Sequence, residues 1–480
     1  MTSFLAFLPE LTLLAGALVL FCVALGDSRE QLARTITLAT AAAALLAAVF
    51  TFSQQAVLFN GAFRVDPFSQ FLKIAITFGY LCIGLLSREL NDINGQTRPE
   101  YHLFLNFSVI GLVLLVSSVD LITLVLALEL SSFALYLLVP MRRERTGQRV
   151  QMESAIKYLM FGVAATGVML FGMSYLYGLT GSTSLAVIMA KLPALLGSPL
   201  AIVGLALTLA GLLYKLAVFP FHFWTPDVYQ GAANETAGLV ASLPKVGAVA
   251  VLVRLVSLAT PDTASFATLL TCLAIASMVY GNLIAIVQTD FKRLLGFSGI
   301  AHAGYALVGF VALDDAGYAA ALYYIVGYML MVLACFVVIC RVSREGTNVA
   351  IGDLAGLHRR SPLLAATLLV GVFALAGLPP FVGFMGKLGL LTAALNRGHL
   401  ALVVITVINS AVAIYYYLRI IRAAFFGESE EVAAPLKLNW STAVLCVLLI
   451  ASITALGVAP AGVVETISRS LAAVRFPLLG

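Results

Sequence analysis

Fourteen long apolar runs divide this chain, and they constrain its fold more than any other feature of the sequence. Each approaches the roughly 20 residues that a helix needs to cross the hydrocarbon core of a bilayer. The runs are too long and too uniformly apolar for the alternating strands, each of about ten residues, of a membrane β-barrel. We therefore predict an all-α integral membrane protein with fourteen transmembrane helices, which begin near residues 4, 33, 67, 101, 119, 152, 200, 237, 263, 293, 316, 361, 399 and 441.

Composition supports the same class and excludes others. Hydrophobic residues make up 61% of the chain and charged residues 11%, whereas about 25% of a soluble domain is charged. No polar stretch is long enough for a soluble domain, none resembles a nucleotide-binding fingerprint, and none is basic enough to indicate nucleic acid. The first run, Phe4–Leu25, lacks the basic start of a signal peptide, so we expect it to be a retained helix.

The six cysteines all lie in apolar runs, and none forms a C-x-x-C pair. This distribution is typical of small buried side chains and not of zinc or iron–sulfur ligands. We expect no metal in this chain, and any redox chemistry that it serves takes place in another chain.

The distribution of arginine and lysine among the connections predicts the orientation. The connections after odd-numbered helices carry most of these residues, and cytoplasmic loops are enriched in them. The odd-numbered connections are therefore predicted to be cytoplasmic, with both termini on the non-cytoplasmic side.

Five of the eight lysines lie inside apolar runs, whereas almost all arginines lie in the connections. An ionisable group at membrane depth is costly and usually serves function. Burial brings the pKa of lysine towards neutral pH, whereas arginine stays protonated in proteins. This partition indicates proton transfer, and the five lysines are Lys73, Lys157, Lys215, Lys245 and Lys387.

Two of these lysines lie beside prolines that interrupt a helix. Lys215 precedes Pro220 by five residues, and Lys387 follows Pro379 and Pro380. Proline removes a backbone donor and breaks the helix, which at membrane depth is tolerated where it lines a cavity or is buried in protein.

The breaks fall in helices 7 and 12, five helices apart, as expected for two inverted repeats. We predict helices 1–3 in residues 1–100, the first repeat (helices 4–8) in 101–257, the inverted second repeat (helices 9–13) in 258–425, and helix 14 with the tail in 426–480.

Other titratable residues at membrane depth suggest partners for the lysines. Glu129 lies well inside helix 5, and a short connection makes Lys157 its nearest intramembrane cation in sequence, so we predict a Glu129–Lys157 ion pair. A static ion pair is the alternative to a functional one. His302 and His222 are candidates for proton relay, or else are neutral histidines satisfied by neighbouring groups.

Two of the five lysines lie near the start of their helices. Lys245 either belongs to the functional set or extends to the interface, as a long cationic side chain can. For Lys73 we expect the interfacial position.

Six motifs stand out along the sequence: Pro226–Ala232, Leu243–Lys245, Asp290–Ser298, Ile300–Tyr305, Ile351–Leu357 and Leu375–Lys387. They resemble the antiporter-like membrane subunits of complex I, the NADH–quinone oxidoreductase, and in particular the subunit N type. A lysine at 387, instead of the glutamate usual in subunit M, and a short tail after the last helix, unlike the lateral helix of subunit L, favour the N type. Ala233-Asn234-Glu235-Thr236 departs from the proline-containing family pattern, which leaves the shape of this connection and the role of Glu235 open.

The resemblance implies one proton channel in this subunit. Glu129 and Lys157 are then the modulating pair, Lys215 the switching lysine, Lys245 the bridge and Lys387 the outlet, while His222, His302 and Tyr305 help water to carry protons. Quinone reduction elsewhere drives the cycle. Quinone, FMN and iron–sulfur clusters are expected in partner subunits, and M-type and K-type subunits are the expected neighbours in the bacterial inner membrane.

Other functions are compatible with the same features. These are an Mrp-type cation/proton antiporter, the equivalent subunit of a membrane-bound hydrogenase, a solute symporter with inverted repeats, and a structural spacer in a membrane complex. The symporter is disfavoured because, lysines apart, few polar residues lie at membrane depth.

Overall fold

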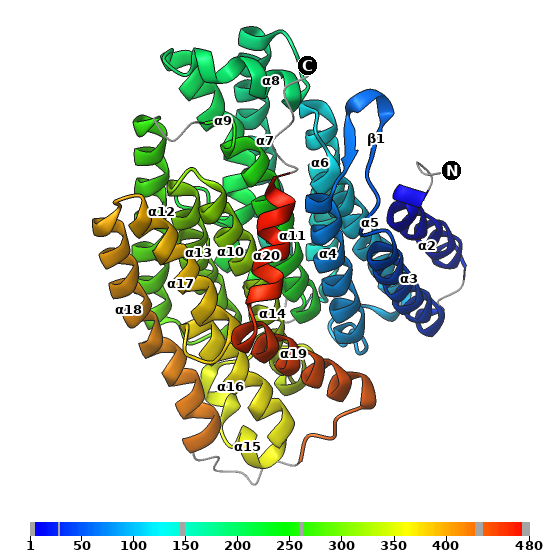
Figure 1. The fold of residues 1–480 in the computed structure, drawn as a ribbon. Helices are drawn as coiled ribbons and strands as arrows, with labels where there is room; N and C mark the ends of the chain where they lie inside the picture. Colours follow the sequence, from blue (N-terminus) through cyan, green and yellow to red (C-terminus); the bar gives the residue numbers. More distant parts are fainter. Residues whose placement is uncertain (1–4, 27–28, 145–148, 260–262, 428–434, 473–480) are drawn as a thin grey trace.

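A computed structural model describes residues 5–26, 29–144, 149–259, 263–427 and 435–472. Helices form nearly all of it (Figure 1). In chain order they are α2 (Leu8–Ala24), α3 (Glu30–Phe50), α4 (Pro67–Leu86), α5 (Arg98–Ser117), α6 (Leu121–Leu138), α7 (Val150–Thr180), α8 (Leu185–Lys191), α9 (Pro199–Leu216), α10 (Trp224–Gly231), α11 (Asn234–Val256), α12 (Ala264–Val287), α13 (Phe291–Val311), α14 (Asp315–Val342), α15 (Leu357–Arg360), α16 (Pro362–Ala376), α17 (Val382–Asn396), α18 (Leu400–Phe426), α19 (Trp440–Val458) and α20 (Ala461–Leu471).

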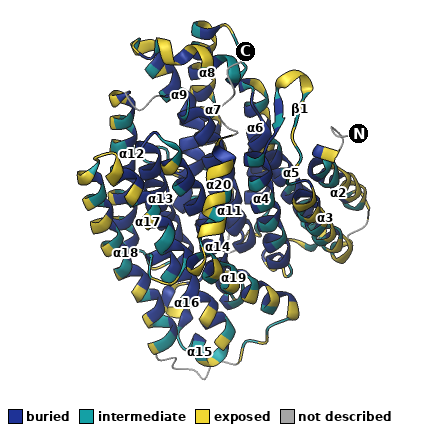
Figure 2. Ribbon diagram, viewed as in Figure 1, coloured by how far each residue is buried: buried dark blue, intermediate teal, exposed yellow. Residues whose placement is uncertain are grey.

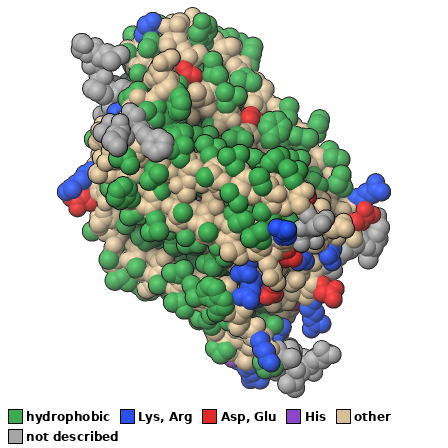
Figure 3. Space-filling model, turned by 90° about the vertical axis from the view of Figure 1, so that its right-hand side faces the viewer, with side chains coloured by type: hydrophobic (Ala, Val, Ile, Leu, Met, Phe, Trp, Pro, Cys, Tyr) green, Lys and Arg blue, Asp and Glu red, His purple; other side chains and the backbone are tan. Residues whose placement is uncertain are grey.

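Twelve helical segments in these ranges are long and apolar enough to cross a membrane. Two further predicted runs correspond to α2, which is slightly shorter, and to the pair α16–α17. Hydrophobic side chains cover the broad middle of one face, while charged side chains gather at its margins (Figure 3). The chain is an all-α integral membrane protein, as its apolar runs predict.

A small antiparallel hairpin between α3 and α4 was not predicted from the sequence. Strand β1 (Ala56–Leu58) pairs with β2 (Phe63–Val65), with Ala56 opposite Val65. It leads into α4 through Asp66, whose side chain accepts a hydrogen bond from the amide of Ser69 in a capping box. A carboxylate or hydroxyl at this position satisfies free amides of a first helical turn.

Both predicted helix breaks are present. After α9 ends at Leu216, Ala217 adopts a left-handed conformation with φ of 63°, and Pro220 lies in the segment before α10. After α16 ends at Ala376, Gly377 takes the same role with φ of 84°, and Pro379 and Pro380 precede α17.

Residues 101–257 and 258–425 share a pattern of packing. In the first segment α5 packs against α6 and α11, and α7 contacts both α9 and α10. In the second, α12 packs against α13 and α18, and α14 contacts both α16 and α17.

The backbone hydrogen bonds repeat in the same way. The amide of Leu121 donates to Thr183 O, and that of Leu185 donates to Val119 O. Equivalently, Phe291 N donates to Val349 O, and Ile351 N donates to Thr289 O. Each pair ties the start of the unit's second helix to the end of its third.

Helices α11 and α13 lie at the centre of the molecule, and every residue in their membrane-length windows is buried (Figure 2). The broken helices pack around them: α10 contacts both, α9 contacts α11, and α17 contacts α13. Broken helices from both halves of the chain therefore pack against the same central pair, α11 and α13.

Candidate functional site

Three of the predicted lysines are buried in this interior. Lys215 lies in the last turn of α9, Lys245 is on α11, and Lys387 is on α17 directly after the second break. Each ammonium group lies over the face of at least one tyrosine ring. Aromatic faces attract cations, and more strongly where water is displaced.

Lys215 is held by aromatic rings alone. Its Nζ lies 5.9 Å from the ring centre of Tyr136 and 5.7 Å from that of Tyr158. It has no hydrogen-bond partner among the described residues. The indole of Trp224 donates to Tyr214 O at 3.0 Å, which ties α10 to the end of α9. An ammonium group in such surroundings is costly to keep charged.

Glu129 and Lys157 do not pair with each other, so the predicted ion pair is wrong for this structure. Lys157 Nζ lies 2.7 Å from Asp227 Oδ2 and 2.7 Å from Glu153 Oε1, and its side chain is 38% exposed. Glu129 accepts a hydrogen bond from Thr166 at 2.6 Å. Thr166 lies nine residues beyond Lys157 on α7, or about 14 Å along the helix axis.

Glu129 is instead the carboxylate within electrostatic range of another lysine, Lys215. Asp227 takes the expected place of Glu129, since it holds Lys157 and also Arg293, whose Nη1 lies 2.8 Å away.

Lys245 does not extend to the interface. It is buried, and its Nζ lies 3.2 Å from Gly299 O and 3.4 Å from the Tyr328 hydroxyl. Glycine permits this arrangement, because a Cβ on residue 299 would lie 2.9 Å from both Lys245 Nζ and Tyr328 Oη and would displace at least one of them.

His302 occupies the centre of a hydrogen-bonded network beyond Lys245. Its Nδ1 lies 2.6 Å from the Tyr324 hydroxyl, and its Nε2 lies 2.9 Å from the Tyr417 hydroxyl. Ser298 bonds to Tyr417 at 2.5 Å. The ring of Tyr328, which contacts Lys245, lies 5.0 Å from the imidazole.

Lys387 lies at the far end of this network. Its Nζ donates to Ala376 O at 3.1 Å and to Leu375 O at 3.3 Å, which are terminal carbonyls left without helical partners by the break after α16. It lies 4.7 Å from the ring centre of Tyr305, which in turn packs against His302 with ring centres 5.7 Å apart. Lys245, Tyr328, His302, Tyr305 and Lys387 are therefore in continuous contact.

His222 is buried but is not joined to this network by any hydrogen bond within the described ranges. Its ring packs against Phe219, Phe223 and Tyr280. The structure therefore gives it packing contacts, and its relay role stays a prediction.

Lys73 is not at the interface, contrary to expectation. It is fully buried, and its Nζ lies 2.7 Å from Glu10 Oε1, which is also buried. The glutamate comes from α2, which packs against the helices near α4 and is remote in sequence. The short distance of Lys73 from its helix start therefore did not indicate exposure.

Several residues of the site were not identified from the sequence. Tyr158, Asp227 and Tyr328 contact the lysines, while Lys292 is a further fully buried lysine. The spacing of Tyr324 and Tyr328, four residues apart and thus on one helical face, is a signal that identifies part of this set.

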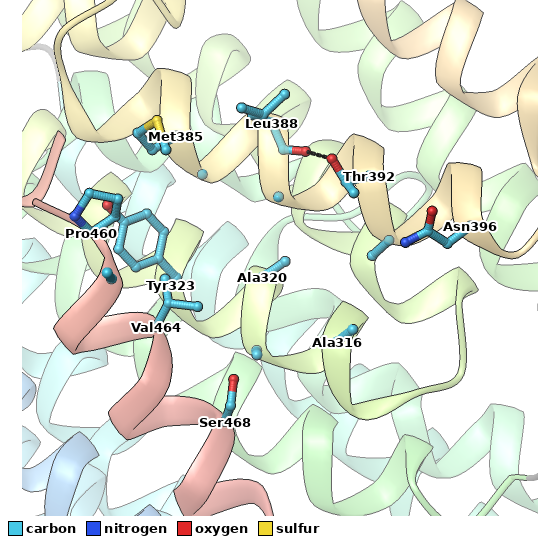
Figure 4. A pocket seen from close by; sticks show the side chains of 15 residues that line it. Ala316, Ala320, Tyr323, Met385, Leu388, Thr392, Asn396, Pro460, Val464 and Ser468 are labelled. Atoms are coloured by element: carbon cyan, nitrogen blue, oxygen red, sulfur yellow. Dashed lines mark hydrogen bonds between the residues drawn. The ribbon is translucent and has the colours of Figure 1, made fainter. Parts of the chain in front are cut away.

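A separate cavity of about 460 Å³ lies between α14, α17 and α20 (Figure 4). Small and apolar side chains such as Ala320 and Leu388 line it, together with Thr392, Asn396 and Ser468. No lysine lines it. It therefore does not belong to the lysine path, although Gly386 at its wall is adjacent to Lys387.

Comparisons with known proteins agree with this architecture. Residues 118–413 match the family model described as NADH:quinone oxidoreductase/Mrp antiporter, TM. NADH-quinone oxidoreductase subunit N 2 of Opitutus terrae is 72% identical over 99% of both chains, and that of Solidesulfovibrio magneticus is 45% identical over 90% of this chain and 91% of the relative.

Solved structures show the same fold. A chain of respiratory complex I from Thermus thermophilus with bound aureothin has a TM-score of 0.81 and 31% identity over 95% of this chain and 98% of its own. A chain of the Mrp complex from Dietzia sp. DQ12-45-1b has a TM-score of 0.88 at 22% identity, over 99% and 97%. The second likeness concerns the fold alone. The chain belongs to the subunit N family of NADH-quinone oxidoreductases, within the wider NADH:quinone oxidoreductase/Mrp antiporter membrane family.

Proposed function

We propose that this chain is the proton-translocating, antiporter-like subunit N of an NADH–quinone oxidoreductase. The observation that best supports this proposal is a series of contacts between buried side chains. It leads from Lys245 through Tyr328, His302 and Tyr305 to Lys387. The 72% identity to a subunit N favours this function over that of an Mrp antiporter or hydrogenase subunit. Its partners are other membrane subunits of the complex, with M-type and K-type neighbours, and quinone, FMN and iron–sulfur clusters belong to partner subunits.

The path passes from the first half of the chain to the second. Lys215 changes its protonation beside the break after α9, under the field of Glu129, and this switch controls when Lys245 passes a proton to the network around His302. Lys387 releases it beside the break after α16. The repeated packing and hydrogen bonds support an inverted relation of residues 101–257 and 258–425. The arginine-rich connections support a cytoplasmic entrance and non-cytoplasmic termini.

Glu129 has a direct role in this scheme, independent of Lys157. Charges in a low-dielectric interior interact strongly over several ångströms, and Glu129 is the carboxylate that acts on Lys215. A change in its distance or protonation alters how readily Lys215 holds a proton. Lys157 acts separately, through Asp227 at the start of α10.

Lys245→Arg tests the path at its middle. Arginine keeps the positive charge but does not deprotonate, so we expect proton translocation to fall by at least about 100-fold, within the range for loss of an acid–base group. The measurement is NADH-driven acidification of vesicles containing the reconstituted complex. Lys191→Arg is the matched control, because Lys191 donates to Thr180 O away from the path. Normal translocation by Lys245→Arg would exclude a proton-carrying role for this lysine.

Gly299→Ala tests the geometry without changing a charge. The added Cβ would lie 2.9 Å from Lys245 Nζ and from Tyr328 Oη, so it must displace one of them. A displacement of about 1 Å at a reacting group costs up to about 100-fold in rate, and we expect a loss of that order in the vesicle assay. Gly167→Ala is the control, since open space surrounds its added Cβ. Equal activity of the two variants would contradict the close approach at Lys245.

A further inference from the structure

Glu235 is a buried carboxylate that the proposed path of lysines does not use. It lies in the first turn of α11 and is 6% exposed. The groups within electrostatic range of it are Arg341, Lys292, Asp92, Tyr101 and Cys340. The free amides of a helical first turn also favour an anion. Both charged and neutral groups therefore surround this carboxylate.

Arg341 connects the buried Glu235 with an exposed carboxylate at the surface. Arg341 is 10% exposed, and its Nη1 lies 2.8 Å from Glu89 Oε2, whose side chain is 48% exposed. Exposure therefore falls in order from Glu89 through Arg341 to Glu235. In the proposed orientation this end of α11 faces the cytoplasm, the side from which protons are taken up.

Buried polar atoms without a hydrogen bond to any described residue lie on α11 next to Glu235 and on the preceding helix α10. Asn234 Oδ1, Thr236 Oγ1, Thr225 Oγ1 and the hydroxyl of Tyr229 are buried and have no hydrogen bond to another described group. Buried polar groups are nearly always hydrogen-bonded to protein or water, so these atoms define hydratable positions.

The last two of these residues lead to Lys245. Thr225 and Tyr229 are on α10, which packs against α13. A Cβ on Gly296 would lie 3.6 Å from Thr225 O, and one on Gly299 would lie 3.8 Å from Tyr229 Oη and 2.9 Å from Lys245 Nζ. Two of the hydratable positions thus lie beside Glu235 at the start of α11 and two on α10, which contacts both α11 and α13, with the Tyr229 hydroxyl close to Lys245.

Lys292 is a cation beside the start of α11, where two of the hydratable positions lie. It is fully buried in the first turn of α13, and its Nζ donates to Ala232 O at 2.8 Å. Ala232 lies in the two-residue connection that precedes Asn234 and Glu235. Lys292 therefore fixes the connection and provides positive charge within electrostatic range of the Glu235 carboxylate.

We propose that Glu235 is a proton-uptake site that supplies Lys245 directly, with Lys292 as its positioning partner. The inference rests on the proposed function, because it assumes that Lys245 carries protons. The Glu235 carboxylate takes up one proton from the cytoplasmic side. The neutral amine of Lys245 then receives one proton through water at the hydratable positions. One positive charge moves inward, and no other bond changes.

Glu235→Gln and Glu235→Asp distinguish proton uptake from a structural role. Glutamine keeps the size and hydrogen bonding of glutamate but carries no titratable proton, whereas aspartate keeps the acid on a shorter side chain. The readout is the protons translocated per NADH that depend on this subunit, taken as the difference between the unaltered complex and its Lys215→Arg variant. We expect Glu235→Gln to lower this subunit-dependent number of protons per NADH by at least about tenfold, and Glu235→Asp to retain most of it. Glu465→Gln, which removes an exposed carboxylate paired with Arg469 in α20, is the matched control and retains it.

The outcomes separate the two proposals. Normal subunit-dependent translocation by Glu235→Gln overturns the uptake role, and so does a greater loss with Asp than with Gln. If Lys215→Arg itself changes nothing, the proposed function fails instead. If Glu235→Gln prevents assembly, Lys292→Arg and Lys292→Met decide the matter: retention with Arg and loss with Met support the charged partner, while equal behaviour of the two overturns it.

Discussion

Substituting Lys215 by arginine is expected to abolish proton translocation through this subunit while the complex remains assembled. Arginine keeps the charge that the Tyr136 and Tyr158 rings accommodate, but it remains protonated in proteins. The Lys215 ammonium makes no hydrogen bond to a described residue, so its function does not depend on a hydrogen-bonded ion pair that arginine would preserve. The expected loss is at least about 100-fold.

The measurement is the rate of NADH-driven acidification of vesicles, with NADH oxidation recorded in parallel. Lys437→Arg is the control, because Lys437 is an exposed residue outside the path. Native gel electrophoresis verifies assembly of both variants. Unimpaired translocation by an assembled Lys215→Arg complex would refute the switching role of this lysine.

Replacing Glu10 by glutamine is expected to produce the largest loss of stability. Lys73 and Glu10 are both buried, with their charged atoms 2.7 Å apart, and removal of one partner leaves the other charge uncompensated. Such a change typically costs about 3–5 kcal/mol. We expect a lower thermal denaturation temperature in detergent and less assembled complex.

A double variant separates the cost of the isolated charge from the value of the pair. Replacing a buried ion pair by apolar side chains is often neutral or stabilising, so Glu10→Gln with Lys73→Met is expected to recover most of the stability. Arg469→Gln is the control, since it breaks an exposed pair with Glu465 in α20 and such pairs contribute about 0–1 kcal/mol. A single Glu10→Gln variant as stable as this control would show that Lys73 is not held by Glu10.

The sequence predicts features that depend on chemistry local to the chain. Pro220 and the pair Pro379–Pro380 cannot continue a helix, so the two breaks follow from residue type alone. The burial of Lys215 and Lys387 follows from their position inside apolar runs beside those breaks. The fourteen runs likewise correspond to helices or to a broken pair, since hydrocarbon requires backbone groups to be satisfied within the segment.

Side-chain pairing depends on how helices rotate and slide against each other, which one sequence does not specify. Glu129 and Lys157 are close in the chain, but α6 and α7 pack so that Glu129 faces Thr166. The partners of Lys157 and Lys73 include Asp227 and Glu10, each more than 60 residues away in the chain. In the sequence, the tyrosines around the lysines cannot be distinguished from ordinary packing residues. Their contacts with the ammonium groups follow only from the folded structure.

Asp227 is shared by cations from the two halves of the chain. Lys157 belongs to the first half and Arg293 to the second, and both contact this one carboxylate at 2.7 and 2.8 Å. Competition for a common anion is reciprocal, because whatever draws one cation away strengthens the hold on the other. We therefore expect a movement of α7 that displaces Lys157 to tighten the contact of Arg293 with Asp227, and a movement of α13 to do the same for Lys157. Asp227 is thus a shared anion through which a change in one half of the chain is expected to alter an ion pair in the other half.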